Sequence, residues 1–418
     1  MSKLTHLIKR SWRESRELKK IANVPLAILF AYLLESGKTK TLLRLDSIIP
    51  LSKQPTITSY YIAHAQYLYG NYDRARDHLA RVLDGSPYHA DATYLLCSIN
   101  EIEGYKDAAW ESIIRLAQNS YRLKTWLIMA NMVNEERDFE LLLREWNRAI
   151  SLNRVERYHL EVNGYISTGA LRAGLYGHAI KIWEDLLEQL KNSNSISRNK
   201  LSPPNFSRVR AEQALLEIKH LLDKNKIEFF LVSGTLLGCV REGRILSHDK
   251  DVDIGVWDDL SRDVLISAFR TSGLFYLQAS RSEHVIRVKH VNGTAIDVFI
   301  HYRQPNDYWH GGVKLKWSNT PFIIIPHPFL GAVFNIPKNY DLYLKENYGN
   351  WRIPIKKYDS SIDTSNSTII NTDELIVSIY RKLVEAILEN EDHSVNEYLS
   401  HLLDLKDKHN LNVQTKHC

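Results

Sequence analysis

The chain has 418 residues, of which 44% are hydrophobic and 25% are charged, and its formal net charge at pH 7 is +5. This composition is typical of a globular protein with at least two domains, and the small positive charge suits an anionic substrate without requiring one. The cysteines lie far apart, which excludes a disulfide framework and a thiolate zinc site and favours a reducing cytoplasm: Cys97, Cys239 and Cys418.

Residues 1–50 are predicted to form an N-terminal helical segment. The apolar run VPLAILFAYLL, residues 24–34, is shorter than the roughly 20 residues that a membrane-spanning helix needs. Basic residues precede it without a small-residue cleavage site, so a secretory signal is not indicated: Lys9, Arg10, Arg13, Arg16, Lys19 and Lys20. We expect a solvated basic helix followed by a core helix. The alternative is a peripheral anchor on an anionic membrane leaflet.

Residues 51–190 contain a degenerate repeat. Similar segments align on aromatic residues that lie 33, 34 and 37 positions apart: Tyr72, Tyr105, Phe139 and Tyr176. Three positions after each comes a small or apolar residue that would let antiparallel helices approach: Ala75, Ala108, Leu142 and Ala179. The pattern resembles a tetratricopeptide (TPR) array, which implies paired helices and a concave surface for a protein partner or for the neighbouring domain.

A second domain is expected after a linker at residues 191–206, which is rich in Ser, Asn and Pro. This domain, residues 207–360, opens with an amphipathic helix. A tail at residues 361–418 is predicted as a polar loop followed by one helix near 373–406. The predicted fold class is therefore α+β, with a helical repeat array followed by a mixed α/β domain.

Short β-type runs follow the opening helix of the second domain. IEFFLVS (227–233) predicts a buried strand, and GTLLGCVREG (234–243) predicts a tight turn into a short helix. DVDIGV and GTAIDVFI predict two further strands, and acidic residues lie within or just before them: Asp249, Asp251, Asp253 and Asp297. Because burying unpaired carboxylates is costly, a cation is expected to compensate these charges.

Magnesium is the expected cation, since carboxylate oxygens are its preferred protein ligands. Two ions about 4 Å apart would support in-line phosphoryl transfer, and manganese is the alternative metal. A competing interpretation treats the aspartates as turn residues paired with Arg241, Arg244 or Lys250. The succession of a glycine turn and two acidic strands favours the metal site.

The segment FLVSGTLLGCVREGRILSHDKDVDIGV resembles the motif of the fukutin and LicD-like branch of the nucleotidyltransferase fold. The similarity continues through IDVFIHY, YWHGGVKLKW and residues 336–359, and it covers about residues 207–360. Several separated motifs in one order make the resemblance specific. It implies transfer of ribitol phosphate, glycerol phosphate or phosphocholine from a cytidine diphosphate (CDP) donor to a sugar hydroxyl, with release of cytidine monophosphate (CMP).

Matched by position, the acidic residues take the family's metal-binding places: Asp249, Asp251, Asp253 and Asp297. The resemblance implies that Asp251 and Asp253 hold magnesium against the donor diphosphate, with Asp249 as a further ligand. Asp297 would complete the site and receive or orient the proton of the acceptor hydroxyl.

Donor contacts are also expected around the glycine turn. Gly234 and Thr235 match the turn that lies against donor phosphate, and Arg241 matches the basic residue that follows it. Lys289 is expected to help neutralise phosphate charge. The sequence departs from the family pattern at two positions, where tryptophan and histidine are usual: His248 and Glu242. No cysteine cluster follows, so the zinc site of some relatives is not expected.

We therefore expect a cytoplasmic transferase. The alternative is a transferase that binds peripherally to the inner face of the membrane. The enzyme would add alditol phosphate to an oligosaccharide or glycolipid acceptor of a capsule, lipopolysaccharide or teichoic-type polymer, with no nucleic-acid partner. Trp309 and Trp317 are expected to contact the acceptor. Tyr348 and Trp351 are expected to have structural roles. Two histidines stay unassigned: His301 and His310. The alternatives are phosphocholine or nucleotidyl transfer on the same fold, and an inactive TPR-type adaptor.

Overall fold

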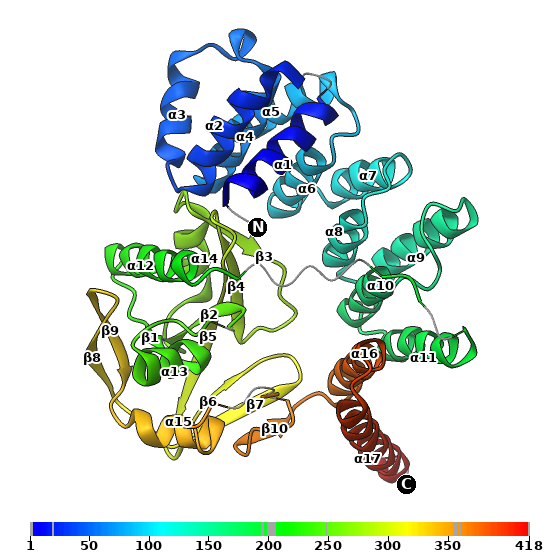
Figure 1. Ribbon diagram of the computed structural model, residues 1–418, viewed down its shortest axis with the longest axis vertical. Coiled ribbons are helices and arrows are strands. Elements are labelled where there is room, and N and C mark those ends of the chain that lie inside the picture. The colour runs from blue at the N-terminus through cyan, green and yellow to red at the C-terminus, as the bar shows by residue number, and fades with distance from the viewer. Residues whose placement is uncertain are drawn as a thin grey trace. The chain divides into compact units, whose positions relative to one another are not determined.

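The computed structural model describes residues 3–18, 21–193, 196–198, 206–247, 249–354, 358–359 and 361–416 (Figure 1). The chain forms two compact units. One contains Met1–Glu103, Pro203–Gly312 and Lys316–Thr368, and the other contains Gly104–Ser202, Val313–Leu315 and Ile369–Cys418. This division cuts through the expected repeat array, because its first helices belong with the sheet and its later helices belong with the C-terminal tail. The fold class is α+β, as predicted.

The first unit begins with six α-helices: α1 (Lys3–Glu17), α2 (Val24–Glu35), α3 (Thr39–Ile48), α4 (Thr56–Leu68), α5 (Tyr72–Gly85) and α6 (Ala90–Ile102). The apolar run at 24–34 forms α2, whose inner face is buried in the core of these helices: Ala27, Phe30, Ala31 and Leu34. It is therefore a core helix, as expected. Among the described residues, no helix is long and apolar enough to cross a membrane.

Helix α4 attaches this bundle to the sheet of the same unit. The hydroxyl of Tyr276, on β3 (Phe275–Gln278), lies 2.9 Å from Nδ1 of His64. The N–H of Gly273 donates to the carbonyl of Leu68 at 2.8 Å. A Cβ at Gly273 would lie 2.3 Å from the ring of Tyr69, so only glycine permits this close approach. The N-terminal helices and the sheet thus share one packed interior.

The sheet of this unit is mixed and has ten strands among the described residues. Its remaining strands are β1 (Phe230–Leu231), β2 (Asp251–Trp257), β4 (Val285–His290), β5 (Ala295–Gln304), β6 (Asp307–Gly311), β7 (Leu315–Asn319), β8 (Ile324–Phe329), β9 (Ala332–Pro337) and β10 (Ser367–Ile369). The main order is β10-β7-β6-β5-β2-β1-β9-β8, and β4 joins β3 to β5. The pairs β2 with β5 and β1 with β9 are parallel, whereas β1 pairs with β2 in the antiparallel direction.

Four helices accompany the sheet: α12 (Arg208–Lys224), α13 (Ser233–Glu242), α14 (Arg262–Arg270) and α15 (Tyr340–Tyr348). The apolar positions of β2 alternate with its acidic ones, and Val252, Ile254 and Val256 are buried in the core. Val298 of β5 lies in the same core. This alternation sends the aspartates to the opposite face of the sheet.

The second unit is helical: α7 (Lys106–Ala117), α8 (Lys124–Met132), α9 (Glu136–Ser151), α10 (Leu160–Arg172), α11 (Tyr176–Ser193), α16 (Thr372–Glu389) and α17 (Asp392–Lys416). Leu142 and Ala179 are buried, as the repeat predicts. The prediction for Ala108 is wrong, because Tyr105 precedes α7 as its N-cap residue and Ala109 is the buried residue. The assignment to a TPR array and its concave partner surface both stay predictions.

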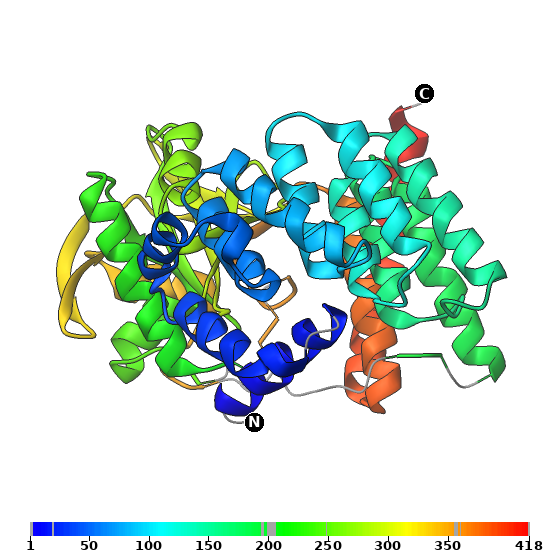
Figure 2. The same cartoon turned by 90° about the horizontal axis from the view of Figure 1, so that it is seen from above.

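The C-terminal tail forms two helices where one was expected. Asn390, in the left-handed conformation with φ of 56°, ends α16, and α17 follows. The hydroxyl of Tyr380 donates to Glu184 of α11 at 2.9 Å. Both C-terminal helices, coloured orange to red in Figure 2, belong to the second unit, whereas the tail up to Thr368 belongs to the first. Of the expected linker, residues 194–195 and 199–205 lie outside the described residues.

Candidate active site

The glycine turn after β1 brings the start of α13 against Asp249. Ser233 has a φ of 47°, a conformation that is costly for a residue with a side chain. A Cβ at Gly234 would lie 2.6 Å from Oδ2 of Asp249. Glycine is therefore required here by a carboxylate that packs directly on the backbone of the turn.

The four predicted aspartates meet on one face of the sheet beside this turn. In the parallel pair of β2 and β5, Asp253 is the register partner of Asp297, and Asp251 is the partner of Ala295. Paired positions of adjacent strands point to the same face. The strand register therefore brings together carboxylates that lie more than 40 residues apart in the sequence, as 297 − 253 = 44.

All four aspartates line a pocket of about 660 Å³. Within the described part of the chain, the charged residues of its lining are these acids together with Arg241 and Lys250. The remaining lining residues are polar or apolar: Ser233, Gly234, Leu237, Leu246, Phe299, His310, Trp317, Asn347, Tyr348, Trp351, Ile353, Tyr358 and Thr364. The pocket thus combines an acidic centre with aromatic walls.

Burial and mutual repulsion disfavour the negative charge of three of these aspartates: Asp249, Asp251 and Asp253. Burial raises the pKa of Asp249 to about 6. Burial, followed by the charges of Asp297 and Asp249, raises the pKa of Asp251 to about 6. The pKa of Asp253 is raised by burial and then by its acidic neighbours, although the backbone N–H of Gly234 partly offsets this. Such shifts are typical of functional sites.

The chemistry of these carboxylates is that of ligands for a divalent cation, although their oxygens are not gathered at coordination distances. No three of the four place their oxygens within 4.8 Å of one another, and like charges without a cation repel each other. Oδ2 of Asp249 is buried and has no hydrogen-bond partner within the described part of the chain. Magnesium or manganese would bind hard oxygen ligands of this kind and would give the unpartnered oxygen of Asp249 a partner.

The other predicted contacts divide into two groups. Arg241 lines the pocket, and its Nη1 donates to the carbonyl of Trp351 at 3.1 Å. Thr235 is fully buried and does not line the pocket. Its hydroxyl accepts a hydrogen bond from the backbone N–H of Asp253 at 2.8 Å. It supports the acidic strand instead of facing the pocket. Lys289 is exposed on β4 opposite Ala295 and does not line the pocket.

Arg287 is a cation of the site that was not predicted from the sequence. It is the register partner of Asp297 on β4, and its Nε donates to Oδ1 of Asp297 at 3.1 Å. The alternation of buried and exposed residues in VIRVKH could have placed Arg287 and Lys289 on one face. It could not have shown which of the two lies opposite Asp297. His248, a predicted departure from the family pattern, lies outside the described residues.

The aromatic residues also separate into two groups. Trp317 lines the pocket, whereas Trp309 stacks on Tyr302 at 4.1 Å between ring centroids and does not belong to the lining. Tyr348 and Trp351 are both packed with the core and part of the lining. Burial, and then the charge of Asp253, raises the pKa of Tyr348 well above its usual value, so this phenol keeps its proton.

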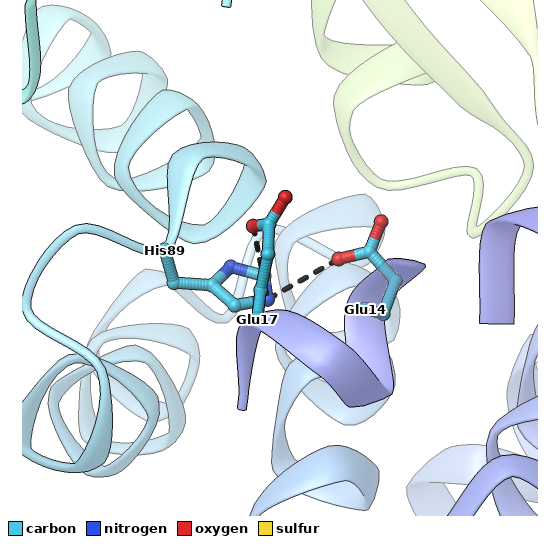
Figure 3. Close-up of side chains that lie close together, drawn as sticks. All are labelled: Glu14, Glu17 and His89. Atoms are coloured by element: carbon cyan, nitrogen blue, oxygen red, sulfur yellow. Dashed lines mark ion pairs between the residues drawn. The ribbon is translucent and has the colours of Figure 1, made fainter. Parts of the chain in front are cut away.

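A second cluster of side chains that could bind a metal lies in the N-terminal bundle, where Glu14 and Glu17 of α1 face His89 (Figure 3). Nδ1 of His89 accepts the N–H of Ala92 at 3.2 Å and caps α6. Because a neutral imidazole carries one N–H, Nε2 holds the proton. That N–H faces the Glu14 carboxylate at 3.2 Å. A metal would need an unprotonated Nε2, so this cluster is a contact between α1 and α6.

Residues 226–339, which include β1 to β9, match the model of the LicD/FKTN/FKRP nucleotidyltransferase domain. Over 162 residues, the chain is 28% identical to the ribitol-5-phosphate transferase FKTN of Homo sapiens and 29% identical to that of Mus musculus. An uncharacterized protein of Rickettsia prowazekii is 28% identical over 106 residues, which are 25% of this chain and 38% of that protein.

The two FKTN matches each cover 36% of this chain and 35% of the relative. The chain therefore spans about a third of the length of these curated relatives. The family match contains the glycine turn and all four aspartates, whereas α1 to α6, α16 and α17 lie outside residues 226–339.

Proposed function

Because residues 226–339 form a fukutin and LicD-like nucleotidyltransferase domain, we propose that this chain transfers an alditol phosphate from a CDP-linked donor to a sugar hydroxyl and releases CMP. Ribitol phosphate and glycerol phosphate are the proposed groups. The proposed acceptor is an oligosaccharide or glycolipid of a cell-surface polysaccharide such as a capsule, a lipopolysaccharide or a teichoic-type polymer. The pairing of Asp253 with Asp297 inside an acidic pocket is the observation that carries this proposal.

Metal binding is assigned to the acidic strand. Asp251 and Asp253 would hold the ion, with Asp249 as the additional ligand from the loop before β2. Bound magnesium would neutralise the charge of the donor diphosphate and of the displaced phosphate. The buried carboxylates would supply the negative charge that holds such an ion in the pocket.

The residues of the chain then position the two substrates. Arg241, at the end of α13, would contact donor phosphate through its guanidinium, and the N-terminal N–H groups of α13 favour the same negative charge. Asp297 would take the proton of the acceptor hydroxyl. Arg287 holds Asp297 in its orientation through their 3.1 Å contact.

The transfer balances without a further reactant. The acceptor oxygen forms a bond to the phosphorus that carries the alditol, and the bond from that phosphorus to the oxygen of CMP breaks. The hydroxyl proton passes to Asp297, and CMP leaves with the electron pair. The product is a phosphodiester between the alditol and the sugar.

A cytoplasmic site of action is part of the proposal. Among the described cysteines, Cys97 and Cys239 are free and buried, as expected for a reducing compartment.

A donor panel tests the proposal directly. The purified chain is incubated with magnesium, with CDP-ribitol, CDP-glycerol or CDP-choline, and with a set of oligosaccharide acceptors, and released CMP is measured. Acceptor-dependent CMP release from an alditol donor is expected. Release from CDP-choline alone would support phosphocholine transfer instead, and silence toward every donor with all four aspartates intact would favour the adaptor alternative.

A further inference from the structure

The pocket has an uncharged aromatic wall next to its acidic centre. We define this wall as Phe299 on β5, His310 on β6 and Trp317 on β7, all of which line the pocket. The rings of His310 and Trp317, which are register partners, stack at 5.4 Å between centroids with an interplanar angle of 19°. Phe299 meets His310 edge to face at 5.3 Å.

A buried histidine supports the wall from behind. His301 on β5 is fully buried, and its ring stacks on His310 at 4.5 Å with an interplanar angle of 23°. In the antiparallel pair of β5 and β6, His301 precedes Tyr302 and His310 follows Trp309, the register partner of Tyr302. Because His310 also pairs with Trp317 on β7, the row of rings continues across three strands. Gly255 leaves room for it, because a Cβ there would lie 2.9 Å from the His301 ring.

His310 has hydrogen-bonding capacity that the described residues do not use. Its side chain is 3% exposed, and its Nδ1 is buried without a hydrogen-bond partner in the described part of the chain. Burial, and then the charge of His301, lowers the pKa of His310 well below its usual value, so the imidazole is neutral. A neutral imidazole has one donor and one acceptor, the same pair of roles that a hydroxyl offers.

The location of the wall separates it from the reacting atoms. Two residues along a strand advance about 7 Å, so Phe299 lies one such step from Asp297, and His301 lies two steps away. His310 contacts the rings of both Phe299 and His301, so the wall begins at the position next to Asp297 on the same face of β5 and continues away from it. The wall can therefore contact the part of a substrate that extends from the reacting centre.

The charges of the lining indicate which part that is. Phosphate groups are attracted to Arg241, Lys250 and a bound cation, and the aromatic wall carries none of these. Apolar ring surface with one unused polar nitrogen suits a neutral molecule that has both C–H and O–H groups. Building on the proposed function, we infer that Phe299, His310 and Trp317 form a subsite for the neutral polyol part of a substrate, with the acceptor sugar as its occupant.

A binding experiment tests the subsite without turnover. The full chain is labelled with ¹⁵N-histidine, and the imidazole signals of His310 are assigned by their loss in H310F, which keeps a flat ring. Galactose, N-acetylglucosamine and ribitol are added separately at millimolar concentration, with inorganic phosphate as the charged control. We expect at least one neutral compound to shift the His310 signals while phosphate does not. Signals that respond to none of the three, or equally to phosphate, would overturn the subsite.

Kinetics with the donor and acceptor that support CMP release identify the occupant. H310F and W317F are expected to raise the acceptor KM by about tenfold, the cost of one hydrogen bond or of comparable ring contact. W309F is the matched control, since Trp309 precedes His310 on β6 but lies outside the lining. A rise in donor KM alone would place the alditol on the wall, and unchanged KM values for folded variants would refute the subsite. Failure of the proposed function appears differently, as no CMP release from the wild type.

Discussion

Asp253 and Asp297 are register partners on the parallel strands β2 and β5, and both face the pocket next to the N-terminus of α13. Asp253 is 9% exposed and has a raised pKa, so its charge is unfavourable without a cation. Asp297 has a cationic partner in Arg287. The pair therefore combines a deeply buried carboxylate with one that is held by an arginine.

The first prediction concerns this pair. Asp253→Asn and Asp297→Asn should each lower CMP release by at least about a hundredfold, because one loses a metal ligand and the other a proton acceptor. Without metal, the melting temperature of Asp253→Asn should be unchanged or higher, since the substitution removes like-charge repulsion. Asp259→Asn is the matched control, because that side chain is 72% exposed beyond the end of β2. Full activity in either site variant would remove that residue from the mechanism.

The second prediction concerns pH and metal. The pKa values of Asp249 and Asp251 are raised to about 6 in the folded chain, against about 4 in an unfolded one. Their contribution to folding is therefore fully present below about pH 4 and is lost as pH rises through about 6. Magnesium should restore stability above that range by binding the ionised form.

Thermal melts between pH 4 and 8, with a chelator or with magnesium, measure this effect. The contributions of the other ionisable groups to the pH dependence of the melting temperature cancel when the wild type is compared with the variant D249N/D251N. In the chelator, the melting temperature of the wild type relative to this variant should fall as pH rises from 4 to 6. A constant difference would contradict the raised pKa values.

The third prediction separates two cations of β4. Arg287→Gln should lower kcat/KM by at least about tenfold, because Asp297 loses a charge-assisted hydrogen bond. Lys289→Gln, two residues further along the same face, should have a smaller effect, since Lys289 lies opposite Ala295. Equal losses would indicate that both cations act on phosphate through their charge, as expected for Lys289 from the sequence.

The fourth prediction concerns the glycine turn. Gly234→Ala should weaken magnesium binding and lower kcat, because the new methyl group would lie 2.6 Å from Oδ2 of Asp249 and displace that carboxylate. Gly177→Ala on α11 is the control, since a Cβ there has no heavy atom within 4 Å. Titration with magnesium at fixed donor concentration gives the change in metal affinity. Unchanged affinity with reduced activity would mean that the turn acts on the donor alone.

The sequence alone determined the α+β class, the short core helix at 24–34 and the succession of turn and acidic strands. These features are local, because periodicity and turn chemistry depend on neighbouring residues. For the same reason, the local pattern around each of the four aspartates was enough to single them out. The split of the tail into α16 and α17 was missed, since Asn390 adopts a left-handed conformation that an asparagine only sometimes takes.

Tertiary structure decided how residues distant in the sequence pair with one another. The register of β4 on β5 places Arg287, and not Lys289, opposite Asp297. The buried hydrogen bond to Asp253 turns Thr235 away from the pocket, and the row of rings joins His310 to Trp317 while Trp309 points elsewhere. Side-chain direction alternates at every residue of a strand, so contacts between strands depend on a register that no single strand's sequence specifies.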